Sequence, residues 1–147
     1  MNNFKIGKYN IKDNTSPFII AELSANHNGK LSNIFKLIDK AKKAGADAIK
    51  IQSYTADAMT LNSKRKEFFL SKGLWKGSYL YDLYLKGATP IEWHEKIFKY
   101  AKKKNILSFS TPFDAHAVKL LSKLNVPAFK IASFEVTDIP LITEVSK

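Results

Sequence analysis

Charged and hydroxyl side chains follow four short apolar segments of this 147-residue sequence. Glu22 ends the run 18–21, and Lys50 and Gln52 belong to the segment 47–52. The other residues of this kind follow the segments near 106–109 and 128–132: Ser110, Thr111, Lys130, Ser133 and Glu135. Two ammonium groups with several hydroxyl donors suit a compact dianion. An anion-binding site is therefore one interpretation of these residues.

Ion pairing is the second interpretation of the same residues. Lys50 and Lys130 could serve only to neutralise Glu22 and Glu135, because a partly buried charge needs a partner whether or not it is functional. The spacing of the residues leaves both interpretations open.

A histidine and a group of aromatic residues are further candidates. His27 lies in the polar stretch Asn26–Gly29, and Asn-Gly is a common turn pair, so we expect a surface residue rather than a ligand. The aromatic side chains could stack on a sugar, although covering apolar surface is the commoner role of such residues. They are Trp75, Tyr79, Tyr81 and Tyr84.

The elements that would position these residues follow from the hydrophobic pattern. Strands are predicted at about 18–23, 47–52, 106–110 and 128–132, and the first has the continuous apolar run of a strand buried on both faces. Between them the 3.6-residue period predicts helices. The first predicted helix has Ser32 as its cap, and the second begins at the capping box Thr89–Glu92. The third has Asp114 as its cap, and the last begins near Thr137. Residues 4–11 read as a β-hairpin.

This alternation predicts an α/β fold with parallel strands joined by right-handed crossovers. A doubly wound sheet and a barrel both satisfy it. The polar residues at every strand end favour a TIM (β/α)₈ barrel, since a barrel brings these ends to one mouth. Such a barrel needs roughly 250 residues. We therefore expect residues 1–147 to form about the first four β/α units, a partial barrel preceded by the hairpin.

Composition limits the broad class. The sequence is 45% hydrophobic and 25% charged, has no cysteine and shows neither a signal peptide nor a membrane-spanning run, so we expect a soluble cytoplasmic protein without a membrane partner. The net charge of +11 raises the alternative of a basic nucleic-acid-binding module. Arg65 is the only arginine, and base readers favour arginine, so we expect no nucleic-acid partner. A non-catalytic half-barrel used for assembly is the other alternative of a different class.

Four motifs in order resemble the sialic acid synthase family, from about residue 17 to the end of the sequence. They are the stretches Phe18–Gly29, Gly45–Gln52, Phe109–Asp114 and Pro127–Glu135. The middle segment, with Gly73–Gly77, Leu80–Tyr84 and Thr89–His94, resembles the pseudaminic acid synthase subgroup, which more usually carries tryptophan where Ile91 stands. N-acetylneuraminate and legionaminic acid synthases are the alternatives within the family.

The resemblance implies a condensation of phosphoenolpyruvate with an N-acetylated amino sugar, a 2,4-diacetamido-2,4,6-trideoxy hexose in this subgroup. Lys50, Lys130, Thr111 and Ser133 would hold phosphoenolpyruvate, with Ser110 in support. Glu22 and Gln52 would face the sugar. Glu22 and Glu135 would be the catalytic carboxylates.

The resemblance also implies features of a longer protein. A divalent metal, Mn or Mg, is expected in the full-length enzyme, with ligands outside residues 1–147. A homodimer is expected as well, with a second half-barrel and an antifreeze-like domain that this sequence lacks. Residues 1–147 alone are expected to be inactive as a synthase and, in solution, to be aggregated, dimerised through an open sheet edge or only loosely folded.

Overall fold

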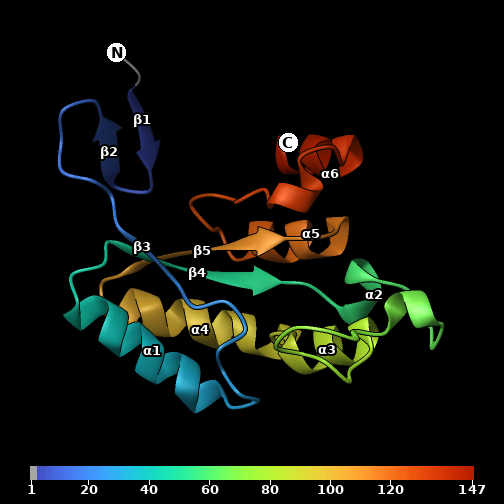
Figure 1. Cartoon of the computed structure of the whole chain (residues 1–147). Coiled ribbons are helices and arrows are strands. Elements are labelled where there is room, and N and C mark those ends of the chain that lie inside the picture. The colour runs from blue at the N-terminus through green and yellow to red at the C-terminus, as the bar shows by residue number, and fades with distance from the viewer. Residues whose placement is uncertain (1–2) are drawn as a thin grey trace.

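The computed structural model describes residues 3–147. It begins with the predicted hairpin, in which β1 (Asn3–Ile6) pairs antiparallel with β2 (Tyr9–Lys12) (Figure 1). Gly7 makes the turn with φ +56°, and a Cβ there would lie 2.7 Å from Leu107. The positive φ of this turn therefore favours glycine, and a side chain there would also have to displace the Leu107 methyl group.

A three-stranded parallel sheet forms the centre of the molecule. Its order is β3 (Ile20–Glu22), β4 (Ala48–Ser53) and β5 (Leu107–Pro112). The parallel register, which sets Glu22 opposite Lys50, confirms the predicted α/β alternation and three of the predicted strands.

The fourth predicted strand, 128–132, is wrong as a full strand. This segment makes a single parallel bridge between Phe129 and Ser110, and the amide of Lys130 donates to the carbonyl of Ser110 at 3.1 Å. Within residues 3–147 the segment has a strand on one side only, so a longer ladder has no second neighbour to support it. The bridge still sets its register and places Lys130 next to Thr111.

The prediction that the first strand is buried on both faces is also wrong. Ile19 is 52% exposed and Ile20 is 41% exposed. β3 lies at the edge of the sheet, with β4 as its neighbour. Leu23, which follows β3, is the residue of this region that enters the core.

Two long helices cover one face of the sheet, α1 (Leu31–Lys43) and α4 (Ile91–Lys103), and their apolar stripes meet β4 (Figure 1). The core between these elements is made of aliphatic residues that are almost fully buried. Its largest members are Ile34, Ile38, Ile49, Ile51, Ile97 and Ile106. Burial of this stripe supplies most of the stability of such helices.

Some of the predicted N-caps of the helices are confirmed and others are wrong. Asp114 caps α5 (Ala115–Lys123), accepting from the amide of Ala117 at 2.6 Å. Asp138 caps α6 (Ile139–Val145), close to the predicted start at Thr137. Ser32 is not a cap, because α1 begins one residue before it, with Lys30 at the N-cap position.

The predicted capping box at Thr89 is wrong for a related reason. Pro90 occupies the N-cap position of α4, and no side chain caps that end. The helix therefore begins one residue later than the Thr–Pro pattern indicates.

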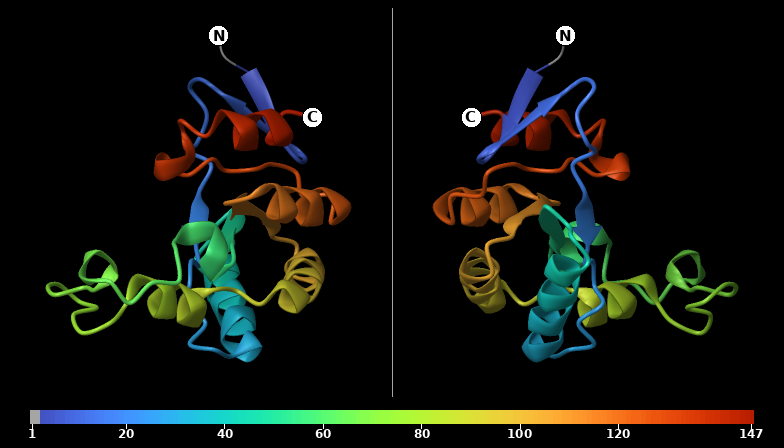
Figure 2. Two further views of the ribbon diagram at one scale, coloured as in Figure 1. Left: turned by 90° about the vertical axis from the view of Figure 1, so that its right-hand side faces the viewer. Right: turned by 90° about the vertical axis from the view of Figure 1, so that its left-hand side faces the viewer.

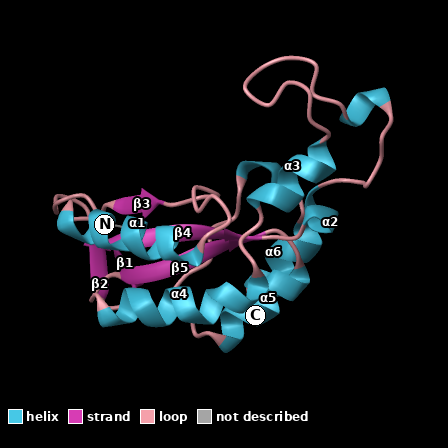
Figure 3. Ribbon diagram, turned by 90° about the horizontal axis from the view of Figure 1, so that it is seen from below, coloured by secondary structure: helices cyan, strands magenta, loops and turns pink. Residues whose placement is uncertain are grey.

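The segment between β4 and α4 contains α2 (Ala56–Met59), the 3₁₀ turn η1 (Lys66–Phe68) and α3 (Leu80–Gly87). Its middle part projects away from the sheet (Figures 2 and 3). A second 3₁₀ turn, η2 (Ser133–Glu135), precedes α6.

Among the helices of residues 3–147, none has the length and apolar character that crossing a bilayer requires.

Candidate functional site

The carboxyl ends of the three strands bring together Glu22, Lys50 and Thr111. The Lys50 ammonium forms an ion pair with Glu22 and donates to the hydroxyl of Thr111 at 3.3 Å. The side chain of Lys50 is only 13% exposed, whereas that of Glu22 is 45% exposed. A poorly solvated cation therefore lies under a carboxylate that solvent can reach.

The loop after β3 ties Glu22 to Gln52. The amide of Ser24 donates to a Glu22 carboxylate oxygen at 2.9 Å, and its hydroxyl donates to Gln52 Oε1 at 3.2 Å. Ser24 holds φ at +48°, a conformation that costs energy for a residue with a Cβ. Ser24 was not among the predicted site residues. Its place in the polar loop directly after Glu22 is the feature of the sequence that could have indicated it.

Lys130, Ser133 and Glu135 lie on the neighbouring segment. Side chains alternate between faces along a strand, so the bridge at Phe129 places Lys130 on the face of Thr111 and Lys50. Lys130 is exposed, and within residues 3–147 no hydrogen bond or ion pair joins it to Lys50 or Glu22. The structure thus places the two lysines on one face without direct contact.

Glu135 has an unusual environment for a carboxylate. Its Oε2 atom is buried and has no hydrogen-bond partner among the described residues. Burial raises the pKa of Glu135, although the charge of Lys130 acts in the opposite direction. Such a group can hold a proton more readily than an ordinary glutamate.

Ser110 lies on the other face of the sheet. Its hydroxyl is fully buried, 2.6 Å from the Ser53 hydroxyl and 3.1 Å from the carbonyl of Ile51. The pairing of Gln52 with Thr111 puts those two residues on the opposite face, because neighbouring residues alternate. Ser110 therefore does not join the lysine cluster, although the sequence grouped it with Thr111.

A cavity of about 680 Å³ adjoins Gln52 and opens toward the projecting segment. Its lining combines polar residues with aromatic and aliphatic ones. The lining residues include Ser24, Asn26, Asn28, Gln52, Tyr54, Leu70, Trp75, Leu83, Tyr84 and Lys86. Of the four aromatic candidates, Trp75 and Tyr84 line the cavity, whereas Tyr79 packs against Phe69 and Tyr81 donates to Asp57.

His27 is not the surface residue that the turn pattern predicted, since it is only 2% exposed. Its Nδ1 accepts from the amide of Gly29 at 3.0 Å, so Nε2 carries the proton and donates to the carbonyl of Gly87 at 3.2 Å. The ring also packs edge-on against Trp93. His27 thus links the loop after β3 to the end of α3, and both of these segments line the cavity.

Comparison with known proteins decides the family. The NeuB family model matches residues 37–147, most of the sequence. The chain belongs to the NeuB family.

The NeuB-family chain is 48% identical over 143 residues to a pseudaminic acid synthase of Campylobacter jejuni, covering 97% of this chain and 41% of that protein. It is 46% identical to the pseudaminic acid synthase of Helicobacter pylori, covering 89% of this chain and 38% of the relative. The chain therefore spans about 40% of the length of these curated relatives.

Solved structures agree with this assignment. The N-acetylneuraminic acid (sialic acid) synthetase of Leptospira borgpetersenii superposes with a TM-score of 0.80 at 30% identity, covering 97% of this chain and 45% of that one. The spore coat polysaccharide biosynthesis protein SpsE of Bacillus subtilis gives a TM-score of 0.73 at 32% identity, covering 99% of this chain and 37% of that one.

The described part of this NeuB-family chain does not fit a divalent metal. Residues 3–147 contain no group of three or more histidine, cysteine, aspartate or glutamate side chains that could hold one.

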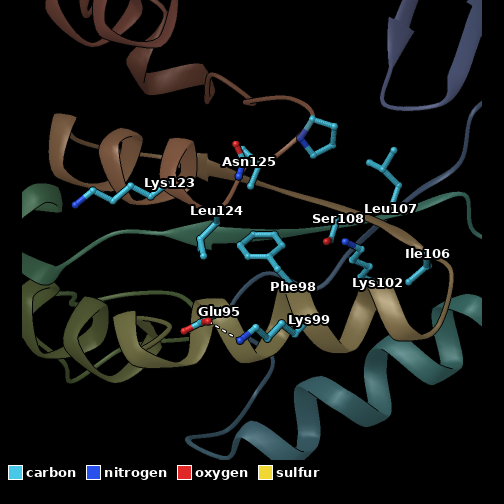
Figure 4. Close-up of a pocket in the computed structure, with 12 residues that line it drawn as sticks. Glu95, Phe98, Lys99, Lys102, Ile106, Leu107, Ser108, Lys123, Leu124 and Asn125 are labelled. Atoms are coloured by element: carbon cyan, nitrogen blue, oxygen red, sulfur yellow. Dashed lines mark ion pairs between the residues drawn. The ribbon is translucent and has the colours of Figure 1, made fainter.

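A second groove of the NeuB-family chain, about 500 Å³ in volume, lies between α4 and the end of α5 (Figure 4). Ile106, Leu107 and Ser108 line it, at the amino end of β5 and thus away from Thr111. Its charged rim includes the exposed pair Lys99–Glu95 at 2.6 Å. None of the candidate site residues borders this groove.

Proposed function

We propose that this chain carries the phosphoenolpyruvate site, and part of the sugar site, of a pseudaminic acid synthase. The observation that carries the proposal is the largely buried Lys50, which contacts Glu22 and Thr111 from neighbouring parallel strands, in a chain 46–48% identical to pseudaminic acid synthases. The reaction is the condensation of phosphoenolpyruvate with a 2,4-diacetamido-2,4,6-trideoxy hexose to a nonulosonic acid and phosphate.

We also propose how the β/α units are arranged in the whole protein. The β/α units belong to a (β/α)₈ barrel, of which residues 1–147 supply about the first half. Support comes from the position of the cluster, since barrel enzymes build their sites at the carboxyl ends of the strands. In such a barrel the face of Lys50 and Thr111 is the inner one, and the face covered by α1 and α4 is the outer one.

Lys50 and Lys130 hold the two anionic groups of phosphoenolpyruvate in this proposal. Thr111 and Ser133 donate hydrogen bonds beside them. Without substrate, the Glu22 carboxylate is paired with the Lys50 ammonium. An arriving substrate anion replaces Glu22 as the partner of Lys50, and the released carboxylate can then face the sugar. The exchange keeps the buried cation paired in both states.

The chemical step joins two carbon atoms. C3 of phosphoenolpyruvate attacks the aldehyde carbon of the open-chain sugar, whose oxygen takes up a proton. Water adds at C2, and phosphate leaves from the resulting hemiketal by cleavage of its C–O bond. The lysines hold a reactant whose charge is redistributed during these steps, which lowers the barrier without reorganising solvent.

Two carboxylates are available for the proton transfers. Glu22 faces the sugar aldehyde together with Gln52. Burial raises the pKa of Glu135, so this carboxylate holds a proton more readily than an ordinary glutamate and suits the delivery of one.

The cavity beside Gln52 suits the sugar. Asn26, Asn28 and Gln52 can bind acetamido and hydroxyl groups, and Trp75 and Tyr84 present apolar surface to methyl groups. A 6-deoxy sugar with two acetamido groups combines these features. N-acetylneuraminate and legionaminic acid synthesis remain the alternatives, and relatives named for the latter reach 36% identity.

The proposal extends to the setting of the enzyme. We infer a homodimer in the cytoplasm that uses a divalent metal, Mn or Mg, bound by residues outside this chain, as the family resemblance implies.

An assay of a full-length synthase containing this sequence tests the function. Phosphate release and product mass are measured with phosphoenolpyruvate and, in separate reactions, the 2,4-diacetamido-2,4,6-trideoxy hexose or N-acetylmannosamine. We expect turnover with the trideoxy sugar and little with N-acetylmannosamine. Preference for N-acetylmannosamine would replace the substrate assignment, and absence of turnover with every sugar would contradict the synthase.

A further inference from the structure

A chain of buried hydrogen bonds crosses the interface between α4 and the sheet. His94 Nε2 lies 2.7 Å from the Ser53 hydroxyl, which lies 2.6 Å from the Ser110 hydroxyl. At its ends, His94 Nδ1 is 3.1 Å from the carbonyl of Pro90, and the Ser110 hydroxyl is 3.1 Å from the carbonyl of Ile51. The side chains of His94, Ser53 and Ser110 are all 0% exposed.

This interface is apolar elsewhere. One and two turns further along α4, Ile97 and Ala101 are buried against the same layer. Burying an imidazole and two hydroxyls costs free energy unless every group finds a partner, and a complete buried network favours one unique arrangement. The network is also confined to the end of the interface nearest the candidate site.

The hydroxyls of the network lie next to two residues of the candidate site. Ser53 follows Gln52, and Ser110 precedes Thr111, so each network hydroxyl is one residue from a site residue on the opposite face of the sheet. A shift of β4 against β5 at this point moves both site side chains together.

We propose that His94 is a positioning residue of the synthase site, acting through Ser53 and Ser110 to hold Gln52 and Thr111 in place. The proposal rests on the proposed function, in which Gln52 and Thr111 meet the substrates. His94 itself touches no substrate, because the sheet separates it from them.

The protons of the network make this coupling dependent on the charge of His94. The four contacts need four protons, whereas a neutral imidazole and two hydroxyls supply three. With Nδ1 donating to Pro90, a neutral ring accepts from Ser53, which accepts from Ser110. In the neutral form the single Ser110 proton is shared between Ser53 and the carbonyl of Ile51, whereas a protonated ring reverses both hydroxyls and leaves the Ser110 proton to Ile51 alone.

The surroundings of His94 favour the neutral ring at pH 7. Burial lowers the pKa of His94, and the carbonyls of Pro90 and Ile91 and the charge of Glu92 oppose this only in part. Glu92 is exposed and belongs to α4 itself. Among the described residues, the strands place the neutral network hydroxyls against the ring, and α4 adds Phe98, whose ring centroid lies 6.4 Å from that of His94.

Steady-state kinetics with phosphoenolpyruvate varied, in a full-length synthase containing this sequence, tests the proposal. Ser53→Ala breaks the network and is expected to lower kcat/KM roughly 10- to 100-fold, because small displacements of positioning groups are costly. His94→Gln keeps an amide near the place of Nε2 and is expected to retain most activity. Ile97→Val, on the same helix outside the network, is expected to lower Tm and leave kcat/KM unchanged.

A Ser53→Ala enzyme with kcat/KM within about twofold of the unsubstituted enzyme, and a Tm lowered as in Ile97→Val, would reduce the network to a structural role and overturn the proposal.

An NMR measurement separates this proposal from the proposed function. The ¹³C-methyl signal of Thr111, assigned by its loss in Thr111→Ser, is compared at pH 7.5 among the unsubstituted protein, Ser53→Ala, His94→Gln and Ile97→Val. We expect Ser53→Ala to shift this signal clearly, His94→Gln to shift it less, and Ile97→Val to leave it unchanged. A signal that Ser53→Ala leaves unchanged overturns the positioning role, whereas a shifted signal in a protein without synthase activity contradicts the proposed function alone.

Discussion

At the scale of single residues, the strongest prediction concerns Lys50, because its ammonium is poorly solvated and contacts two site residues. Lys50→Ala in a full-length synthase should lower kcat/KM for phosphoenolpyruvate by roughly 30-fold or more, since losing the partner of a desolvated anion costs about 2–5 kcal/mol. Lys102→Ala, which removes an exposed lysine of α4, is the matched control and should change kcat/KM little. Equal effects of the two substitutions would mean that only the overall positive charge matters.

The lowered pKa of His94 predicts how stability depends on pH. The unfolded chain takes up a proton on this residue near pH 6.5, whereas burial keeps the folded pKa below that value. The folded state therefore binds fewer protons in this window. The contribution of His94 to the free energy of unfolding is complete above about pH 6.5 and declines as the pH falls through the window below it.

Urea unfolding at pH 7.5 and pH 5.5 measures this dependence. The unsubstituted protein should lose more stability between the two pH values than His94→Gln does, because glutamine does not titrate. An identical loss in the two proteins would show that other groups cause the decline.

At the scale of secondary-structure elements, the helix caps give a direct prediction. Asp114→Ala should lower the free energy of unfolding by about 1 kcal/mol, because the amide of Ala117 loses its partner. Ser32→Ala should have little effect, since that hydroxyl does not cap α1. Chemical denaturation of the two variants tests the pair, and a larger loss for Ser32→Ala would contradict the observed start of α1.

At the scale of the whole molecule, the open side of the sheet predicts association of the 147-residue chain. β3 is an edge strand that exposes Ile20, and on the other side of the sheet, after β5, Phe134 is 89% exposed. Unpaired strand edges with exposed apolar residues promote pairing between chains. Sedimentation velocity at several concentrations should show oligomers of the unsubstituted chain.

Ile20→Lys should reduce this association, because charged residues protect strand edges. Leu74→Lys, on the projecting segment, is the matched control and should leave it unchanged. A chain that stays monomeric at all concentrations, or that responds to Leu74→Lys alone, would contradict association through the sheet edge.

The sequence alone determined the order of the elements and the motifs of the family. The 3.6-residue stripes of α1 and α4 and the alternation in β4 are local patterns, so their elements were predictable from neighbouring residues. Glu22, Lys50 and Thr111 were likewise recognisable, because they are polar residues in or at the end of otherwise apolar strands, and a parallel sheet aligns such strands side by side.

Only the tertiary structure decided which polar residues share a face. Ser110 and Thr111 are adjacent in sequence, yet strand alternation sends Ser110 to the network of His94 and Thr111 to Lys50. His27 is buried because α3, some sixty residues later, supplies the carbonyl of Gly87. Segment 128–132 makes only one bridge, since a strand needs partners that its own sequence does not provide. Burial, register and hydrogen-bond partners all depend on contacts between distant residues, which a local pattern does not contain.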